Sequence, residues 1–201
     1  YRYCEDVWFS TWLYITLSFF YCNMNFIRQS LACSIIVLGY GFIQKKKPIP
    51  FILITLLAAS FHRTALIMIP IYFLVQITLN KKIVIGYSIL VLVTFLASEP
   101  ILDFVTNYIF KAYKNSRYVT RGYSLVFLVI PVTAMIACIS LFWTWRKRDP
   151  DASMLLNMVI ISSTIWLFST KHMIIERFSM YNYVFLLVAI PSALRSLKAS
   201  P

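Results

Sequence analysis

Several basic residues of this chain stand near the ends of long apolar runs, on the side of the membrane where the positive-inside bias disfavours them. When the apolar runs are placed as alternating membrane crossings, these residues all fall on one side. They are Arg28, Arg63, Lys111, Lys114, Arg117, Arg121, Lys171 and Arg177. Ionisable residues at membrane depth are costly and mark functional sites. Because guanidinium groups grip phosphate with paired hydrogen bonds, this gathering of cations predicts an anionic ligand.

The first arginine of this set belongs to the segment Asn25-Phe26-Ile27-Arg28-Gln29, which opens an apolar run. Helical spacing places Asn25, Arg28 and Gln29 on one face. A cation near a helix start is unfavourable beside the positive end of the dipole unless an anion binds there. We take Arg28 as a candidate catalytic residue, and Asn25 and Gln29 as candidate substrate contacts. Alternatively, Asn25 is an N-cap and Arg28 reaches the lipid headgroups.

His62 and Arg63 interrupt the very apolar stretch 49–80. At about 1.5 Å per residue, that stretch is too long for one crossing of about 30 Å and too short for two. We therefore expect a hairpin of two short helices with its tip at His62. Irregular backbone at membrane depth lines a cavity or is buried in protein. His62 is thus a candidate catalytic residue and Arg63 a candidate substrate contact, although a lone histidine can also be structural.

The longest polar segment is 99–122, in which basic and aromatic residues alternate at near-helical spacing. The pattern is typical of a helix lying in the membrane interface, so we expect an outer-side loop with such a helix. Arg117 and Arg121 are one helical turn apart and together suit a phosphate, which makes them candidate substrate contacts. The lysines of this loop can instead rest on lipid headgroups.

Glu176 and Arg177 open the last apolar run, and Tyr181 follows Arg177 by one helical turn. We take Glu176 and Arg177 as candidate catalytic residues and Tyr181 as a candidate substrate contact. The alternative is an interfacial salt bridge beside aromatic residues of the membrane surface.

The elements that must position these residues are hydrophobic helices. Hydrophobic residues make up 60% of the chain and charged residues only 13%, against about 25% charged in soluble domains. Residues 83–98, 123–142 and 152–169 contain no charged side chain. Hydrocarbon accepts segments whose backbone is satisfied internally, and no alternating strand pattern is present. We predict an all-α, polytopic transmembrane helical bundle of about seven to eight membrane segments, forming a single domain over 1–201.

The basic clusters orient this bundle. The apolar runs cover 7–22, 26–44, 49–61, 64–80, 83–98, 123–145, 151–169 and 178–195. Lys45–Lys47, Lys81–Lys82 and Arg146–Arg148 then share one side, which is cytoplasmic because positive charge is retained inside. We therefore expect a multi-pass protein of the cytoplasmic membrane. The chain begins at Tyr1, and we expect it to be a fragment of a longer protein.

Other classes of function are disfavoured by the same pattern. The net charge of +12 does not indicate nucleic acid, because the basic residues cluster at the ends of apolar runs. The four cysteines lack metal-binding spacing, so no metal site is expected. No P-loop, GxSxG or HExxH motif is present, and we expect no cofactor.

Taken in order, these motifs resemble the EpsG family, polytopic membrane proteins of exopolysaccharide and O-antigen synthesis that are similar in role to Wzy polymerases. The resemblance is carried by Asn25-x-x-Arg28-Gln29-x-Leu31-Ala32, by Lys45-Lys46-Lys47, by Leu57-Ala58-Ala59-x-Phe61-His62-Arg63-x-Ala65-Leu66, and by Glu176-Arg177-Phe178 with Tyr181. It covers most of this chain but only the C-terminal half to two-thirds of a typical member. The family's early Arg/Gly/Asp/Tyr-containing segment is absent.

The resemblance implies an enzyme that polymerises polyprenyl-diphosphate-linked oligosaccharide repeat units into exopolysaccharide, capsule or O-antigen at the outer face of the membrane. A sugar hydroxyl of one unit would attack the anomeric carbon of another, and polyprenyl diphosphate would leave. Arginines would stabilise the charge on that diphosphate without a metal. His62 or Glu176 would be the general base. The expected partners are the lipid-linked oligosaccharide, membrane lipids and other polysaccharide-assembly proteins.

Two other functions would also use such residues. A flippase or transporter of the same lipid-linked oligosaccharide needs a cationic cavity, but it predicts inverted repeats and charges distributed through the membrane depth. A membrane acyltransferase that modifies polysaccharide would also use a histidine. Loss of acyl groups with normal chain length would identify the acyltransferase.

Overall fold

The computed structural model describes residues 4, 6–100, 103, 122 and 124–199, and these residues form helices and turns with no strand among them. The all-α prediction is confirmed for this part of the chain. The α-helices are α1 (Val7–Thr16), α2 (Phe19–Asn25), α3 (Ile27–Leu38), α4 (Tyr40–Gln44), α5 (Pro48–Phe61), α6 (Met68–Val75), α7 (Lys81–Leu96), α10 (Val129–Arg146), α11 (Ala152–Ser169), α12 (Glu176–Tyr183) and α13 (Leu186–Arg195). Short 3-10 helices are η1 (Arg63–Ile67), η3 (Leu125–Leu128), η4 (Met173–Ile175) and η5 (Ser196–Ala199).

Helices occupy every predicted apolar run, but three of the runs are divided. Ser18 has a left-handed φ of 63° and separates α1 from α2. Gly39 separates α3 from α4. The last run bends by 52° between α12 and α13. These breaks shorten the helices, and they are set by local backbone geometry that hydrophobicity alone does not reveal.

The number of membrane segments is lower than predicted. In the described part of the chain, Leu125–Arg146 and Ala152–Ser169 are long and apolar enough to cross a membrane, and the bent pair Met173–Tyr183 and Leu186–Arg195 adds a third if counted as one span. The prediction of seven to eight is therefore not supported. The other apolar helices are too short; the 14 residues of α5 reach only about 21 Å, against a hydrocarbon core of about 30 Å.

The predicted break at His62 is present. α5 starts at Pro48, whose missing N–H is no loss in a first helical turn. The helix ends at Phe61, and His62 adopts an extended conformation with φ of −149° and ψ of 109°. The chain then turns into η1 and α6, and both pack against α5. A short helical hairpin with His62 at its tip results.

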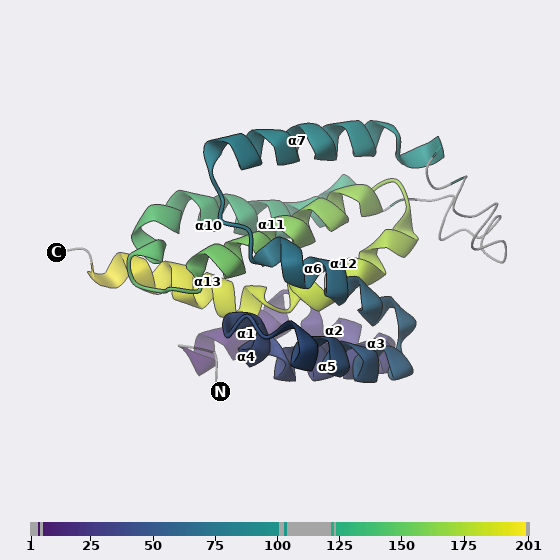
Figure 1. Ribbon diagram of the computed structural model, residues 1–201, viewed down its shortest axis with the longest axis horizontal. Helices are drawn as coiled ribbons and strands as arrows, with labels where there is room; N and C mark the ends of the chain where they lie inside the picture. The colour runs from purple at the N-terminus through teal and green to yellow at the C-terminus, as the bar shows by residue number, and fades with distance from the viewer. Residues whose placement is uncertain (1–3, 5, 101–102, 104–121, 123, 200–201) are drawn as a thin grey trace.

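The helices run mostly along the long axis of the molecule, with α7 along one edge, α1–α5 along the other and α10–α13 between them (Figure 1). α11 packs against α10, α12 and α13, and most of its residues are buried. Large side chains fill the core on both sides of it, including Trp145, Tyr40 and Phe51. Tyr40 packs against Phe185 with ring centroids 5.2 Å apart, which joins α4 to the α12–α13 bend.

A polar network ties the turn between α10 and α11 to α13. The indole Nε1 of Trp145 donates to Ser192 Oγ at 2.7 Å, and Ser192 Oγ donates to Asp149 Oδ2 at 2.6 Å. Asp151, two residues on, accepts a hydrogen bond from Gln44. Burial raises the pKa of the Asp151 carboxyl, the Gln44 hydrogen bond opposes that rise, and the charge of Asp149 adds to it. This network holds α4, α10, α11 and α13 together at one end of the molecule.

At the other end, the predicted interfacial helix of segment 99–122 falls almost wholly outside the described residues. Gly122, where the chain returns, lies against the turn after α11. A Cβ at Gly122 would overlap the carbonyl of Thr170 and approach the backbone of Lys171, so only glycine fits this close approach. The start of η3 is therefore beside the turn that leads into η4.

Candidate functional site

The first turns of α3 and α12 meet, and they carry Arg28 and Arg177, the two arginines predicted from the sequence to be catalytic. Gln29, in the first turn of α3, is 3% exposed, and its Nε2 donates to the backbone carbonyl of Arg177 at 2.6 Å. Arg28 is the neighbouring residue and is exposed, whereas Arg177 is half-buried. The Gln29 hydrogen bond therefore holds the backbone of Arg177 in α12 next to the turn of α3 that carries Arg28.

A second polar contact attaches the hairpin tip to α12. Thr64 Oγ1 and the Tyr181 hydroxyl form a hydrogen bond of 3.0 Å. Thr64 is two residues after His62, and Tyr181 is one helical turn after Arg177. Tyr181 is fully buried, so its hydroxyl acts here as a fixed anchor. This bond fixes the hairpin tip that carries His62 against α12.

His62 lies within the electrostatic influence of both arginines. Burial first, then the positive charges of Arg177 and Arg28, lower the pKa of His62, which lies between helices and outside the candidate spans. Its Nε2 is shielded from solvent and has no hydrogen-bond partner in the described part of the chain. A histidine with a lowered pKa is neutral at pH 7 and can accept a proton. The arrangement places a neutral imidazole near two guanidinium groups.

Glu176 supplies an acidic group to the same region. It is the first residue of α12 and is 9% exposed. A carboxylate is favourable at that position because it faces the positive end of the helix dipole. Burial first, and then the charge of Glu176, raise the pKa of the Cys22 thiol in α2. No cluster of three or more His, Cys, Asp or Glu able to hold a metal ion occurs within the described residues.

The structure thus brings together Arg28, Gln29, His62, Arg177 and Tyr181, with Glu176 beside them. Arg63 follows His62 at the start of η1 and is exposed. The candidates Arg117 and Arg121 lie outside the described residues.

Asn25 differs from its predicted place. Phe26, not Asn25, is the N-cap of α3, and Asn25 is the last residue of α2. Its exposed amide donates to the Tyr21 carbonyl at 2.8 Å. Because the helix breaks at Phe26, Asn25 does not share a helical face with Arg28 and Gln29. The burial of Gln29 and the exposure of Arg28 show that these two side chains also point in different directions.

Two polar residues near this end of the molecule, Thr64 and Asn182, were not predicted from the sequence. Thr64 anchors Tyr181. Lys171, predicted only as one of the outward cations, donates from its Nζ to the Phe95 carbonyl at 2.9 Å. Asn182, next to Tyr181, is 1% exposed, and neither atom of its amide has a hydrogen-bond partner within the part of the chain that the structure describes. An amide inside an otherwise apolar run is the signal that points to Asn182, because buried polar groups are ordinarily paired.

Comparison with known proteins now decides the family, because the model of the EpsG family matches residues 1–201. The chain belongs to the EpsG family. The match covers the whole chain, including the first residues before the Asn25 motif. Neither characterised protein sequences nor solved structures give a significant match. EpsG membership implies a membrane-associated, polymerase-like role in polysaccharide synthesis.

Proposed function

We propose that this protein joins polyprenyl-diphosphate-linked oligosaccharide units into a polysaccharide at the outer face of the cytoplasmic membrane. The observation that carries the proposal is the meeting of α3, α12 and the hairpin tip, which the Gln29–Arg177 and Thr64–Tyr181 hydrogen bonds hold together. An anionic leaving group needs cations, and a hydroxyl nucleophile needs a base. These are the groups that the first turns of α3 and α12 and the hairpin tip bring together.

In the proposed reaction, a hydroxyl oxygen of the acceptor sugar attacks the anomeric carbon of the donor. The bond between that carbon and the diphosphate oxygen breaks, and the hydroxyl proton passes to the imidazole of His62. Polyprenyl diphosphate leaves with its negative charge, which the guanidinium groups of Arg177 and Arg28 stabilise. Glu176 is the alternative base. Gln29 holds Arg177, and the Thr64–Tyr181 bond holds the hairpin tip that carries His62.

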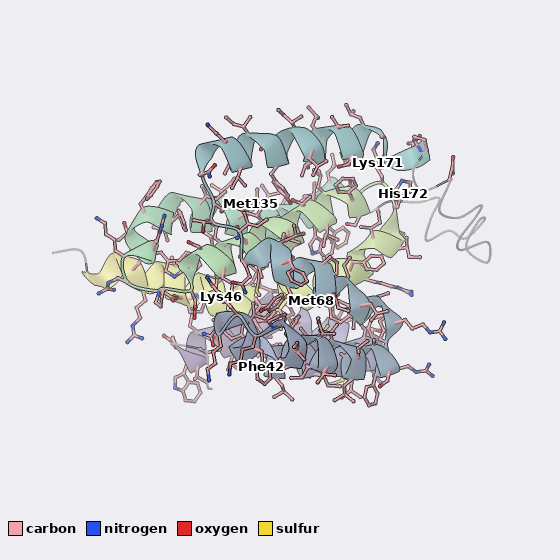
Figure 2. The ribbon with its side chains drawn as sticks, viewed as in Figure 1. Phe42, Lys46, Met68, Met135, Lys171 and His172 are labelled. Atoms are coloured by element: carbon pink, nitrogen blue, oxygen red, sulfur yellow. The ribbon has the colours of Figure 1, made fainter. Side chains whose placement is uncertain are left out.

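We also propose a multi-pass topology in which 45–47, 81–82 and 146–148 face the cytoplasm, while 99–122 and 170–177 face outward. The positions of the labelled side chains support this proposal. Lys171 and His172 lie together at one end of the molecule, and Lys46 lies toward the other end (Figure 2). Glu176 and Arg177, on the first turn of α12, follow Lys171 and His172 in the chain after the three residues of η4.

The topology predicts a clear labelling pattern at the two ends of η3 and α10, where Ser124 and Lys147 are both exposed. A membrane-impermeant maleimide added to intact cells should label Ser124→Cys and not Lys147→Cys. Detergent should make both positions reactive, and the parent chain serves as the blank for the native cysteines. Labelling of Lys147→Cys alone would contradict the proposed orientation.

The function itself is tested in a strain that lacks this protein. We expect long polysaccharide chains to be lost and completed lipid-linked single units to accumulate on the outer leaflet. Accumulation on the inner leaflet would identify a flippase instead. Normal chain length with missing acyl groups would identify an acyltransferase. Restoration of long chains by the wild-type gene is the control.

A further inference from the structure

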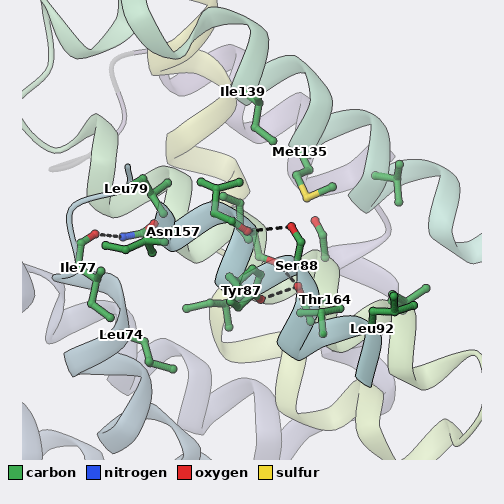
Figure 3. Close-up of a pocket in the computed structure, with 18 of the residues that line it drawn as sticks. Leu74, Ile77, Leu79, Tyr87, Ser88, Leu92, Met135, Ile139, Asn157 and Thr164 are labelled. Atoms are coloured by element: carbon green, nitrogen blue, oxygen red, sulfur yellow. Dashed lines mark hydrogen bonds between the residues drawn. The ribbon is translucent and has the colours of Figure 1, made fainter. Parts of the chain in front are cut away.

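A separate cavity lies between α7 and the pair α10 and α11, away from the contact of α3 with α12 (Figure 3). Its volume is about 450 Å³, within the range of small-molecule sites. Apolar side chains from four helices make up most of its wall, among them Leu74, Ile83, Val91, Phe95, Met135 and Ile139. We call it the α7–α11 groove.

The polar residues of the groove are already bonded within the protein. Tyr87 and Thr164 form a hydrogen bond of 2.6 Å with each other. Asn157 donates from its Nδ2 to the carbonyls of Val75 at 3.0 Å and Ile77 at 2.7 Å. These bonds leave the wall with little to offer a polar ligand. Because water does not fill an apolar cavity without polar partners, the groove suits a hydrocarbon chain.

Two hydrogen bonds attach α7 to α11 and to the turn that follows it, and both lie along the groove. The first is the Tyr87–Thr164 bond near the middle of α7. The second is at the outer end, where Lys171 Nζ donates to the Phe95 carbonyl and lies 4.5 Å from the centroid of the Phe95 ring. From Ile83 to Phe95 the groove extends about 18 Å along the helix axis. An elongated occupant with one end at Lys171 fits this shape.

The positive charge at the outer end of the groove indicates which kind of ligand the groove binds. Lys171 places a cation where the apolar wall ends, and η4 connects it directly to Glu176 and Arg177. In the chain, Lys171 and His172 therefore stand between the end of α11, whose Leu167 lines the groove, and the proposed catalytic residues of α12. A ligand with a long apolar chain and a diphosphate at its end would place its chain against the apolar wall and its diphosphate beside Lys171.

We infer that the α7–α11 groove binds the polyprenyl chain of the lipid-linked substrate, with Lys171 facing the diphosphate at the groove's outer end. This inference rests on the proposed function for the identity of the lipid. In a bilayer, the chain would enter sideways between α7 and α10, and the diphosphate would stay at the end of the molecule that carries Arg177.

The test uses the full chain in nanodiscs of phosphatidylglycerol with radiolabelled polyprenyl diphosphate that carries no sugar. A benzophenone amino acid at Val91, which lines the groove, should capture this probe saturably. Unlabelled polyprenyl diphosphate should compete, and additional phosphatidylglycerol should not. The matched control is Leu90, the adjacent residue, which is 59% exposed and does not line the groove. Equal capture at both positions, or displacement by phosphatidylglycerol, would overturn the inference.

A second measurement separates the groove from general effects on the fold. With the benzophenone placed at Met135 across the groove, Val91→Trp should lower capture at least about tenfold, because many methylene contacts are lost. Leu90→Trp should leave capture unchanged. Lys171→Gln should weaken capture of polyprenyl diphosphate toward that of uncharged polyprenol. Unchanged capture in Val91→Trp would refute the groove.

Failure of the groove and failure of the proposed function give different results. Capture requires no sugar transfer, so it would persist if the null strain accumulated single units on the inner leaflet. Conversely, normal outer-leaflet accumulation in the null strain, together with no capture at Val91, would remove the groove and leave the polymerase.

Discussion

Arg177→Ala is expected to lower the rate of polymer formation by about 10²–10³-fold, the usual cost of losing one group that stabilises transition-state charge. Protein level should stay normal, because Gln29 bonds to the backbone carbonyl of Arg177 and this hydrogen bond survives the substitution. Arg177→Lys should recover part of the rate, since a lysine keeps the charge but lacks the planar fork that binds two phosphate oxygens. Chain length on a gel and lipid-linked single units on each leaflet measure the effect.

The companion variant Arg28→Ala should act in the same direction. Its effect should be smaller, because Arg28 is exposed and solvent screens its charge. Lys147→Ala is the matched control, an exposed cation at the opposite end of the molecule. If both arginine variants retained full activity, or if single units accumulated on the inner leaflet, we would abandon the polymerase assignment.

His62→Gln has the other large expected effect, a loss of about 10²–10⁴-fold in the rate of sugar transfer, which is the usual contribution of a general base. Glutamine approximates the size of the imidazole and keeps a hydrogen-bonding group, but it cannot take the proton of the acceptor hydroxyl. The rate is measured in membrane vesicles with saturating lipid-linked donor. If Glu176 is the base instead, His62→Gln should stay active and Glu176→Gln should be inactive.

The pH dependence of the rate provides an independent check on His62. Its pKa is lowered by burial and by the charges of Arg177 and Arg28, so the neutral, active form persists to lower pH than for an ordinary histidine. Activity should be present above this pKa and lost as the pH falls through it. Arg28→Gln removes one cause of the lowering, so the acidic limb should move to higher pH. Arg28→Lys keeps the charge and should leave the limb in place, and an unmoved limb in both variants would exclude His62 as the titrating group.

Some features of the site could be predicted because they depend on composition and helix length. The stretch 49–80 is longer than one membrane-crossing helix. The thickness of the membrane therefore predicts a break near its middle, at His62. Arg28 and Arg177 each stand at the start of an apolar run on the same predicted side, and the two helix starts do meet. Such predictions need only the length of each hydrophobic stretch and the thickness of the membrane.

Other features depend on which way side chains point and on where helices break. Gln29 and Arg28 are adjacent, yet one is buried against α12 and the other is exposed, because the packing of α3 on α12 selects the face. The prediction that Asn25 shares a helical face with Arg28 and Gln29 is wrong because the helix breaks at Phe26. The hydrophobicity of the sequence does not indicate that break. The lower number of full-length spans has the same cause at Ser18, Gly39 and the α12–α13 bend.

The amino-acid sequence by itself determined the all-helical class, the break at His62 and the family. Each depends on local composition or on ordered motifs, which the linear chain contains in full. Only the tertiary structure decided that Thr64 anchors Tyr181, that Gln29 holds the backbone of Arg177, and that α7 leaves an apolar groove beside α11. These features join residues that are far apart in the chain, and their formation depends on how helices pack, which is a property of the whole molecule.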